Sequence, residues 1–152
     1  PSRGLGDVYK RQNDVFLRVA GFEESEIIGR PHSIIRHPDM PRCVFQLLWD
    51  TINAGEEIFA FVVNRAKCGD HYWVLAHVTP TFSNTGEIVG FHSSRRVPER
   101  AAIDAVSGIY AELREIEARG DKQEGMAEAG RTLVAKLESL GITYPEFVFQ
   151  MV

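Results

Sequence analysis

Three stretches with strong β-strand character, joined by short glycine-containing connections, constrain the fold of this chain more than any other feature. The stretches cover 58–65, 71–79 and 88–96, and they are rich in β-branched and aromatic residues. The connections, 66–70 and 83–87, have the length and glycine content of hairpin loops. The pattern therefore predicts an antiparallel meander of three strands.

Two side chains in the meander are candidate ligand contacts. Asn64 ends an otherwise apolar strand, and a buried amide there would need a partner, either a ligand ring or a neighbouring backbone group. Trp73 would serve either as a core residue or as a platform for a cofactor. In the alternating middle stretch, Trp73 and Tyr72 fall on opposite faces.

Short helices are predicted before the meander. Asp39 is expected to cap the longest of them, with Pro41 in its first turn. Glycines follow the three apolar stretches, as is typical of helix ends. The stretches are 13–19, 23–28 and 41–52, and the glycines are Gly21, Gly29 and Gly55.

Two longer amphipathic helices are predicted after Pro98, followed by a short helix that starts with a Thr143–Glu146 capping box. Their apolar stripes must be buried, either in an intramolecular hairpin packed on the sheet or in a helix that dimerises or transmits a signal. The fold class is therefore α+β. The stripes consist of Ile103, Val106, Ile109, Tyr110, Leu113 and Ile116, then Met126, Leu133, Val134, Leu137 and Leu140.

Composition excludes several classes of protein. The chain has 152 residues with 17 basic and 21 acidic side chains, a net charge of −4 that argues against nucleic-acid binding through a basic face. Two cysteines exclude a disulfide scaffold. The longest apolar run, 58–63, is too short to span a membrane, and no signal peptide opens the chain. We expect a cytoplasmic domain with Cys43 and Cys68 as free thiols.

Residues 1–12 lack any periodic pattern and resemble translated sequencing-adaptor read-through. We therefore expect three parts: a non-native segment over 1–12, a sensor domain over 13–98, and a helical extension over 99–152. The boundary is placed at Pro98, because proline disfavours a helical conformation of the residue before it.

The loop 29–41 concentrates histidine, arginine, proline and aspartate directly before a helix. Arg36, His37 and Asp39 would face one region near that helix N-terminus, which suits an anionic group. The alternative is a helix-entry loop whose charges pair with each other. A ligand site would form a cavity bordered by Arg36, Asn64 and Trp73.

Metal and catalytic sites have little support. His37, Cys43, Cys68 and His71 are zinc-type ligands, but their spacing does not match a usual zinc site. There is no nucleophile elbow, phosphate-binding loop or dinucleotide fingerprint. We expect no catalytic residues, no resident metal and no enzymatic activity.

Several motifs together resemble PAS domains of the aerotaxis-receptor type, over 13 to about 98. The most specific are Arg-His-Pro-Asp-Met-Pro at 36–41 and Asn-Arg at 64–65 with Gly-Asp-His-Tyr-Trp-Val at 69–74. The match is extended by Asn13-Asp-Val-Phe16, Gly21-Phe22, Gly29-Arg-Pro-His32, Phe45, Leu48-Trp49, Gly55 and Thr79-Pro80.

The resemblance implies a five-stranded antiparallel sheet with short helices on one face and FAD between the two. It places Asn13, Arg36, His37, Asp39 and Asn64 at positions associated with flavin binding. It also implies that the first strand and most of the second precede Asn13. The family usually has Trp and Gly where this chain has Ile58 and Ala60. Heme ranks below flavin, because the helix over 41–52 contains no histidine, so that His37, His77 or His92 would have to serve as its ligand.

The sequence thus predicts a bacterial signal-transduction sensor domain that detects redox or oxygen state through a bound flavin. The signal would pass through 88–96 to the C-terminal helices and then to a chemotaxis or other signalling partner, with dimerisation through 101–140. The alternative is a ligand-free interaction module whose cavity is filled by side chains such as Ile58, Phe59, Phe61 and Phe91.

Overall fold

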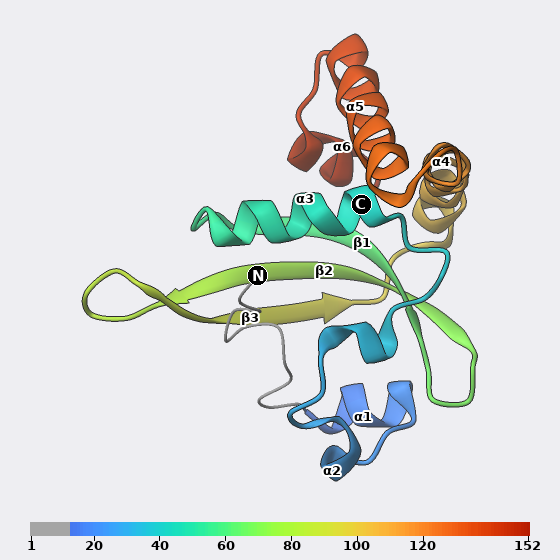
Figure 1. Ribbon diagram of the computed structural model, residues 1–152. Helices are drawn as coiled ribbons and strands as arrows, with labels where there is room; N and C mark the ends of the chain where they lie inside the picture. The colour runs from blue at the N-terminus through green and yellow to red at the C-terminus, as the bar shows by residue number, and fades with distance from the viewer. Residues whose placement is uncertain (1–12) are drawn as a thin grey trace.

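A computed structural model describes residues 13–152 (Figure 1). It is an α+β fold in which three strands form one sheet between two groups of helices. In chain order the elements are α1 (Asp14–Ala20), α2 (Glu24–Ile27), the 3₁₀ helix η1 (His32–Ile35), α3 (Arg42–Asn53), β1 (Ile58–Arg65), β2 (His71–Phe82), β3 (Ile88–Arg96), α4 (Arg100–Glu117), α5 (Lys122–Leu140) and α6 (Tyr144–Gln150).

The strands form the predicted meander in the order β1-β2-β3, with both pairs antiparallel. The register places Val63 opposite Trp73 and Asn64 opposite Tyr72. The turn between β1 and β2 contains Gly69 at φ +99°, a backbone conformation that glycine adopts without strain. The meander prediction is confirmed, and β2 extends three residues beyond the predicted 71–79.

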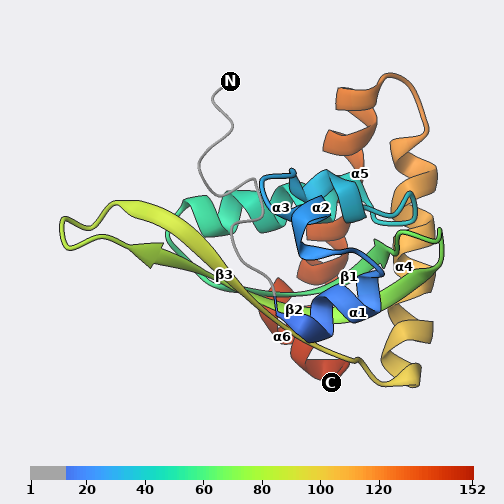
Figure 2. The ribbon, with the colours of Figure 1, turned by 90° about the horizontal axis from the view of Figure 1, so that it is seen from below.

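The inner face of the sheet, which carries Asn64 and Tyr72, lies toward α1 and α3 (Figure 2). Trp49 of α3 makes an edge contact with Phe91 of β3 at 5.7 Å between ring centroids, and the Arg95 guanidinium lies over the Phe16 ring of α1. The inner-face positions on the central pair are Ile58, Ala60, Val62 and Asn64 with Tyr72, Val74, Ala76 and Val78.

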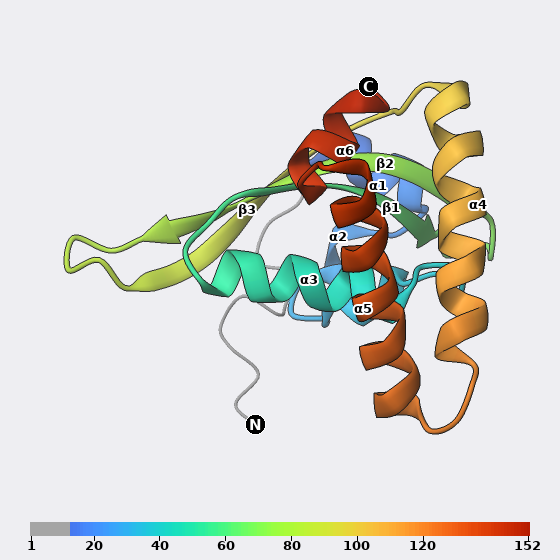
Figure 3. The same cartoon turned by 90° about the horizontal axis from the view of Figure 1, so that it is seen from above.

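The outer face of the sheet packs against the C-terminal helices. The ring of Phe59 lies 4.9 Å from the Phe149 ring of α6, and the ring of Trp73 lies 5.7 Å from the Tyr110 ring of α4. Figure 3 shows α5 lying beside α4 and over α3, with α6 near β1. Phe59 and Phe61 therefore point away from the space between the sheet and the N-terminal helices.

The C-terminal helices share one hydrophobic core with the sheet and α3. Val106, Leu113 and Val148 are fully buried in the same cluster as Val44 and Phe61. Most of the predicted stripe residues are thus buried in an intramolecular hairpin, one of the two predicted alternatives. Val134 and Leu140 of the second stripe are exposed instead. The boundary expected at Pro98 falls between β3 and α4.

The start of α3 differs from the sequence prediction. The helix begins at Arg42 with Pro41 as its N-cap, and Pro41 has no side-chain acceptor for the free backbone N–H groups. The Glu117 carboxylate at the end of α4 accepts from the N–H groups of Arg42 and Cys43 instead. The prediction that Asp39 caps this helix is wrong, because Asp39 lies too far before Arg42 and pairs with Arg114.

Among residues 13–152, no helix combines the length and the apolar composition needed to span a membrane. Residues 1–12 lie outside the described part of the chain. Their interpretation as adaptor-derived, and the strands expected before Asn13, therefore stay predictions.

We predict that Tyr110→Phe lowers the free energy of unfolding by about 1–3 kcal/mol, because a buried acceptor loses its donor. The Tyr110 hydroxyl donates a 2.5 Å hydrogen bond to the Phe61 carbonyl. Urea unfolding measures the change. The matched control is Tyr72→Phe in ligand-free protein, since the Tyr72 hydroxyl donates to no acceptor among the described residues. Equal effects of the two substitutions would contradict this assignment.

Candidate ligand site on the inner face of the sheet

Three buried hydrogen-bond donors on the inner face of the sheet lack partners among the described residues. They are Asn64 Nδ2 on β1, the Tyr72 hydroxyl on β2 and a terminal guanidinium nitrogen of Arg95 on β3. Asn64 and Tyr72 are register partners, and Arg95 pairs with Ala76 on the same face. Buried donors without acceptors are costly in a folded protein. Their arrangement therefore suits a ligand rich in acceptor oxygens or nitrogens.

His32 adds a neutral polar side chain near these donors. Burial, followed by the charges of Arg95 and Arg36, lowers the pKa of His32 to about 4. The ring contacts Trp49 edge-on at 6.5 Å between centroids. At neutral pH the imidazole is uncharged and offers one donor and one acceptor nitrogen.

Arg36 and Asn64 are brought together as the sequence predicts. They form an isolated antiparallel bridge that joins the segment after η1 to β1. The Arg36 guanidinium lies 4.0 Å from the centroid of the Phe45 ring of α3, in cation–π geometry. Arg36 therefore also links the loop to α3.

The remaining polar residues of the loop contact partners other than Asn64. The Asp39 N–H donates to His37 Nδ1 at 3.1 Å, and the Asp39 carboxylate pairs with Arg114 of α4. The His37 ring lies 5.4 Å from the His71 ring, measured between centroids. The Asp39 charge is therefore paired outside the loop 29–41, whereas the alternative interpretation expected pairing within it.

Asn13 acts as the N-cap of α1, where its side-chain oxygen accepts from the Phe16 N–H at 2.9 Å. This local role accounts for an asparagine at that position, because asparagine is a preferred N-cap residue. Among the described contacts, none joins Asn13 to the buried donors of the sheet.

Trp73 lies on the outer face, so the expected border of Arg36, Asn64 and Trp73 does not form. Its register partner is Val63, and its ring contacts Tyr110 of α4. Neighbouring residues of a strand point to opposite faces, so Tyr72 takes the position beside Asn64.

A signal for Tyr72 was present in the sequence, because counting back across the 66–70 turn pairs it with Asn64. Arg95 and His32 had no comparable signal. Their positions depend on how β3 and η1 pack against the rest of the chain.

The described residues contain no cluster of three or more histidine, cysteine or acidic side chains that could hold a metal ion. Cys43 is buried and Cys68 is exposed, so the zinc ligand set considered from the sequence is not assembled. Burial and the nearby Glu117 carboxylate raise the pKa of the Cys43 thiol to about 12, which makes it unreactive.

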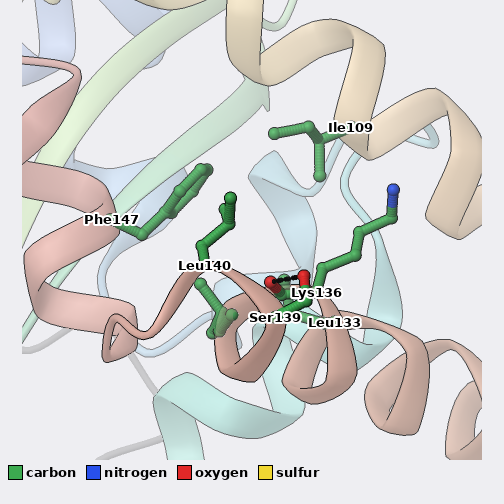
Figure 4. A pocket seen from close by; sticks show the side chains of 7 residues that line it. Ile109, Leu133, Lys136, Ser139, Leu140 and Phe147 are labelled. Atoms are coloured by element: carbon green, nitrogen blue, oxygen red, sulfur yellow. Dashed lines mark hydrogen bonds between the residues drawn. The ribbon is translucent and has the colours of Figure 1, made fainter.

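A groove lies between the C-terminal helices, away from the inner face of the sheet. Figure 4 shows this groove, whose volume is about 250 Å³. Lys136 at its rim pairs with Glu112 at 2.9 Å. The lining residues are Ile109, Leu133, Lys136, Leu137, Ser139, Leu140 and Phe147.

Comparison with known proteins agrees with this architecture. Residues 10–95 match the family described as the PAS fold, so the chain belongs to the PAS-fold family. Two solved light-oxygen-voltage domains share the fold. One was studied with a flavin analogue and has a TM-score of 0.59 at 16% identity, covering 72% of this chain and 78% of that one. The other, from the photoreceptor Aureochrome1, has a TM-score of 0.57 at 19% identity, covering 72% and 82%.

Two signalling proteins are similar to this chain in sequence. The chain is 42% identical to the aerotaxis receptor of Escherichia coli (strain K12) over 101 residues, which are 66% of this chain and 20% of that protein. It is 25% identical to a blue-light-activated histidine kinase of Brucella anthropi over 83 residues, 55% of this chain and 17% of the kinase. The matched segments are a fifth or less of the length of these relatives. Together the similarities place the chain in the PAS-fold family, with a receptor and a histidine kinase among the proteins similar to it.

We predict that acidification destabilises the protein through His32. The pKa of His32 in the folded state is about 4, below its ordinary value of 6.5, so the unfolded chain binds this proton first. The stabilising contribution is complete above about pH 6.5 and is lost as the pH falls toward 4. Between pH 7 and pH 5 the wild type should lose about 2 kcal/mol more than His32→Asn, as measured by urea unfolding. Parallel pH profiles for the two proteins would refute this.

Proposed function

We propose that this chain is a redox- or oxygen-sensing domain that binds a flavin, FAD, between the inner face of the sheet and the N-terminal helices. The observation that carries the proposal is the group of unpartnered buried donors of Asn64, Tyr72 and Arg95. Similarity to an aerotaxis receptor and to light-oxygen-voltage domains supports the choice of ligand class.

The donor set fits an acceptor-rich planar ring with an anionic tail. Asn64 and Tyr72 would donate to ring carbonyl oxygens or nitrogens, and Arg95 would pair with a carbonyl or phosphate oxygen. His32, held neutral, would add one donor or acceptor without adding charge. A bound flavin would supply reversible uptake of electrons and protons. Heme has less support, because α3 contains no histidine.

The signal would pass from the inner face through β3 to α4, which follows it directly in the chain. Arg95 connects the two ends of this route. Its side chain reaches the ligand space, and its strand leads into the C-terminal helices. We infer that α4–α6 contact a downstream signalling protein or a second copy of this chain in the bacterial cytoplasm. In this proposal 13–98 is the sensor domain and 99–152 is its output extension.

A ligand-free interaction module is the second candidate. The groove between α4, α5 and α6 favours it, because the apolar side chain of Leu140, which lines the groove, is 66% exposed. In this case the inner face would have no ligand, and its donors would be satisfied by water. The large aromatic residues Phe59 and Phe61 no longer support this candidate, since they belong to the outer face.

The visible absorption spectrum of the protein purified from cells, followed by titration with FAD, distinguishes the candidates. A flavin band pair, or saturable quenching of FAD fluorescence, supports the sensor. A Soret band would indicate heme instead. A colourless protein that does not respond to FAD would favour the interaction module.

We predict that Asn64→Ala, Tyr72→Phe and Arg95→Gln each weaken FAD binding by about tenfold, the usual effect of losing one hydrogen bond to a bound ligand. Fluorescence titration measures the dissociation constants. The control is Trp73→Phe, which removes an indole on the outer face and should leave the affinity unchanged. A tenfold loss of FAD affinity in Trp73→Phe, with no loss in Tyr72→Phe, would show that the ligand binds on the outer face instead. A tenfold change in affinity corresponds to about 1.4 kcal/mol of binding free energy.

A further inference from the structure

Glu117, the last residue of α4, is buried and connects the end of that helix to the beginning of α3. One carboxylate oxygen accepts from the Cys43 N–H at 2.7 Å, and the other accepts from the Arg42 N–H at 3.0 Å. The Arg42 guanidinium donates to the same carboxylate at 3.3 Å and to the Glu117 carbonyl at 3.0 Å. The end of α4 therefore caps the beginning of α3.

A second link lies one turn earlier on α4. Arg114 is three residues before Glu117, so the two side chains share a face of the helix. Arg114 pairs with Asp39, which precedes the start of α3 by three positions. Both links thus join α4 to a single stretch of chain, 36–43, that begins with the Arg36–Asn64 bridge at the ligand site.

Helix α5 closes this junction from the other side. A Cβ atom at Gly125 would lie 2.5 Å from the Glu117 carbonyl oxygen, so only glycine permits this approach. Further along α5, a Cβ atom at Gly130 would lie 3.9 Å from the Cβ of Cys43. The α4–α5 hairpin is therefore packed directly against the first turn of α3.

These contacts make the position of the loop and the docking of the hairpin interdependent. If 36–43 moves away, the Glu117 carboxylate loses its donors while it is still buried. A buried carboxylate without donors is strongly unfavourable, so the hairpin must move as well and expose it. Loss of these contacts would therefore favour a separate, undocked arrangement over a gradual shift of the docked one that the structure shows.

We propose that Glu117 and Arg114 form a clamp that couples the conformation of 36–43 to the docking of the α4–α5 hairpin, as a second output route beside β3. Glu117 and Arg42, which the clamp joins, lie 75 positions apart in the chain. Only the effect of ligand on the clamp rests on the proposed function. The coupling itself is a property of the ligand-free protein.

The ligand-free test uses Glu117→Gln, with Glu115→Gln as the matched control, because Glu115 is an exposed residue of the same helix. The side-chain amide that replaces the carboxylate can accept from one N–H group but turns its own donor toward the other. We expect backbone hydrogen exchange at Arg42 and Cys43 to accelerate about tenfold or more, with a parallel increase at Met40 in the loop. Glu115→Gln should change none of these rates.

A thiol-modification assay reads the same junction without isotope exchange. In a Cys68→Ser background, Cys43 is the remaining cysteine, and it is only 5% exposed. Because the Glu117 carboxylate itself raises the pKa of this thiol, the assay uses Asp39→Asn, which leaves Glu117 in place. Asp39→Asn should raise the rate of reaction with a maleimide about two- to fivefold, since undocking exposes the thiol. Unchanged exchange in Glu117→Gln together with unchanged thiol reactivity in Asp39→Asn would overturn the clamp.

Asp39→Asn keeps the proposal testable if Glu117→Gln does not fold, because the Asp39–Arg114 pair is partly exposed. We expect exchange at Ala129 and Leu133 of α5 to increase about two- to fivefold, the range for an exposed ion pair. Adding Arg114→Gln to Asp39→Asn should produce no further increase, because both substitutions remove one interaction. Exchange in α5 that is identical to wild type in Asp39→Asn would show that loop and hairpin are independent.

The ligand arm uses FAD. If binding of FAD changes the reactivity of Cys43, then FAD and docking of the hairpin are linked. Linkage then requires Glu117→Gln, whose hairpin undocks, to bind FAD with an altered affinity. Glu115→Gln should bind FAD with the wild-type affinity. Equal FAD affinity in all three proteins, together with unchanged Cys43 reactivity, overturns this route for the signal. Absence of FAD binding to the wild type instead rejects the proposed ligand, and the ligand-free measurements still decide the clamp.

Discussion

The register between β1 and β2 determines which side chains reach each layer of the protein. Because Asn64 is opposite Tyr72 and Val63 is opposite Trp73, two polar side chains lie toward the N-terminal helices and a large indole lies toward α4. A shift of one residue would exchange these sets and place Trp73 beside α3. The arrangement of the proposed ligand site and the packing of the C-terminal helices therefore depend on the same pairing.

Helix α3 is the element shared by both halves. On the side of the proposed ligand site, Trp49 of α3 contacts Phe91, and Phe45 contacts Arg36. The N-terminus of α3 receives the Glu117 carboxylate from α4, a residue outside the part of the chain that matches the PAS-fold family. The helical extension of this chain is consequently built into the core, and a change at the ligand side has a short path to it through α3 as well as through β3.

Much of the local structure could be predicted, because it depends on neighbouring residues. The meander follows from strand composition and glycine turns, and the capping box of Thr143 and Glu146 is present as expected. Arg36 and Asn64 were candidates that the fold does bring together. The cap of α3 could not be predicted, since Glu117 is distant in the chain and nothing local marks it as the partner of a helix that begins at Arg42.

The sequence by itself determined the α+β class, the three-stranded meander and the amphipathic helices, because periodicity and turn chemistry act over a few residues. Tertiary structure decided which polar groups share a site. Tyr72 replaces Trp73 beside Asn64 through strand register, and Arg95 and His32 join them through the packing of β3 and η1. It also assigned Asp39 to Arg114 rather than to a helix cap. These outcomes depend on which surfaces meet, and the meeting of surfaces far apart in the chain is set by burial of the whole core.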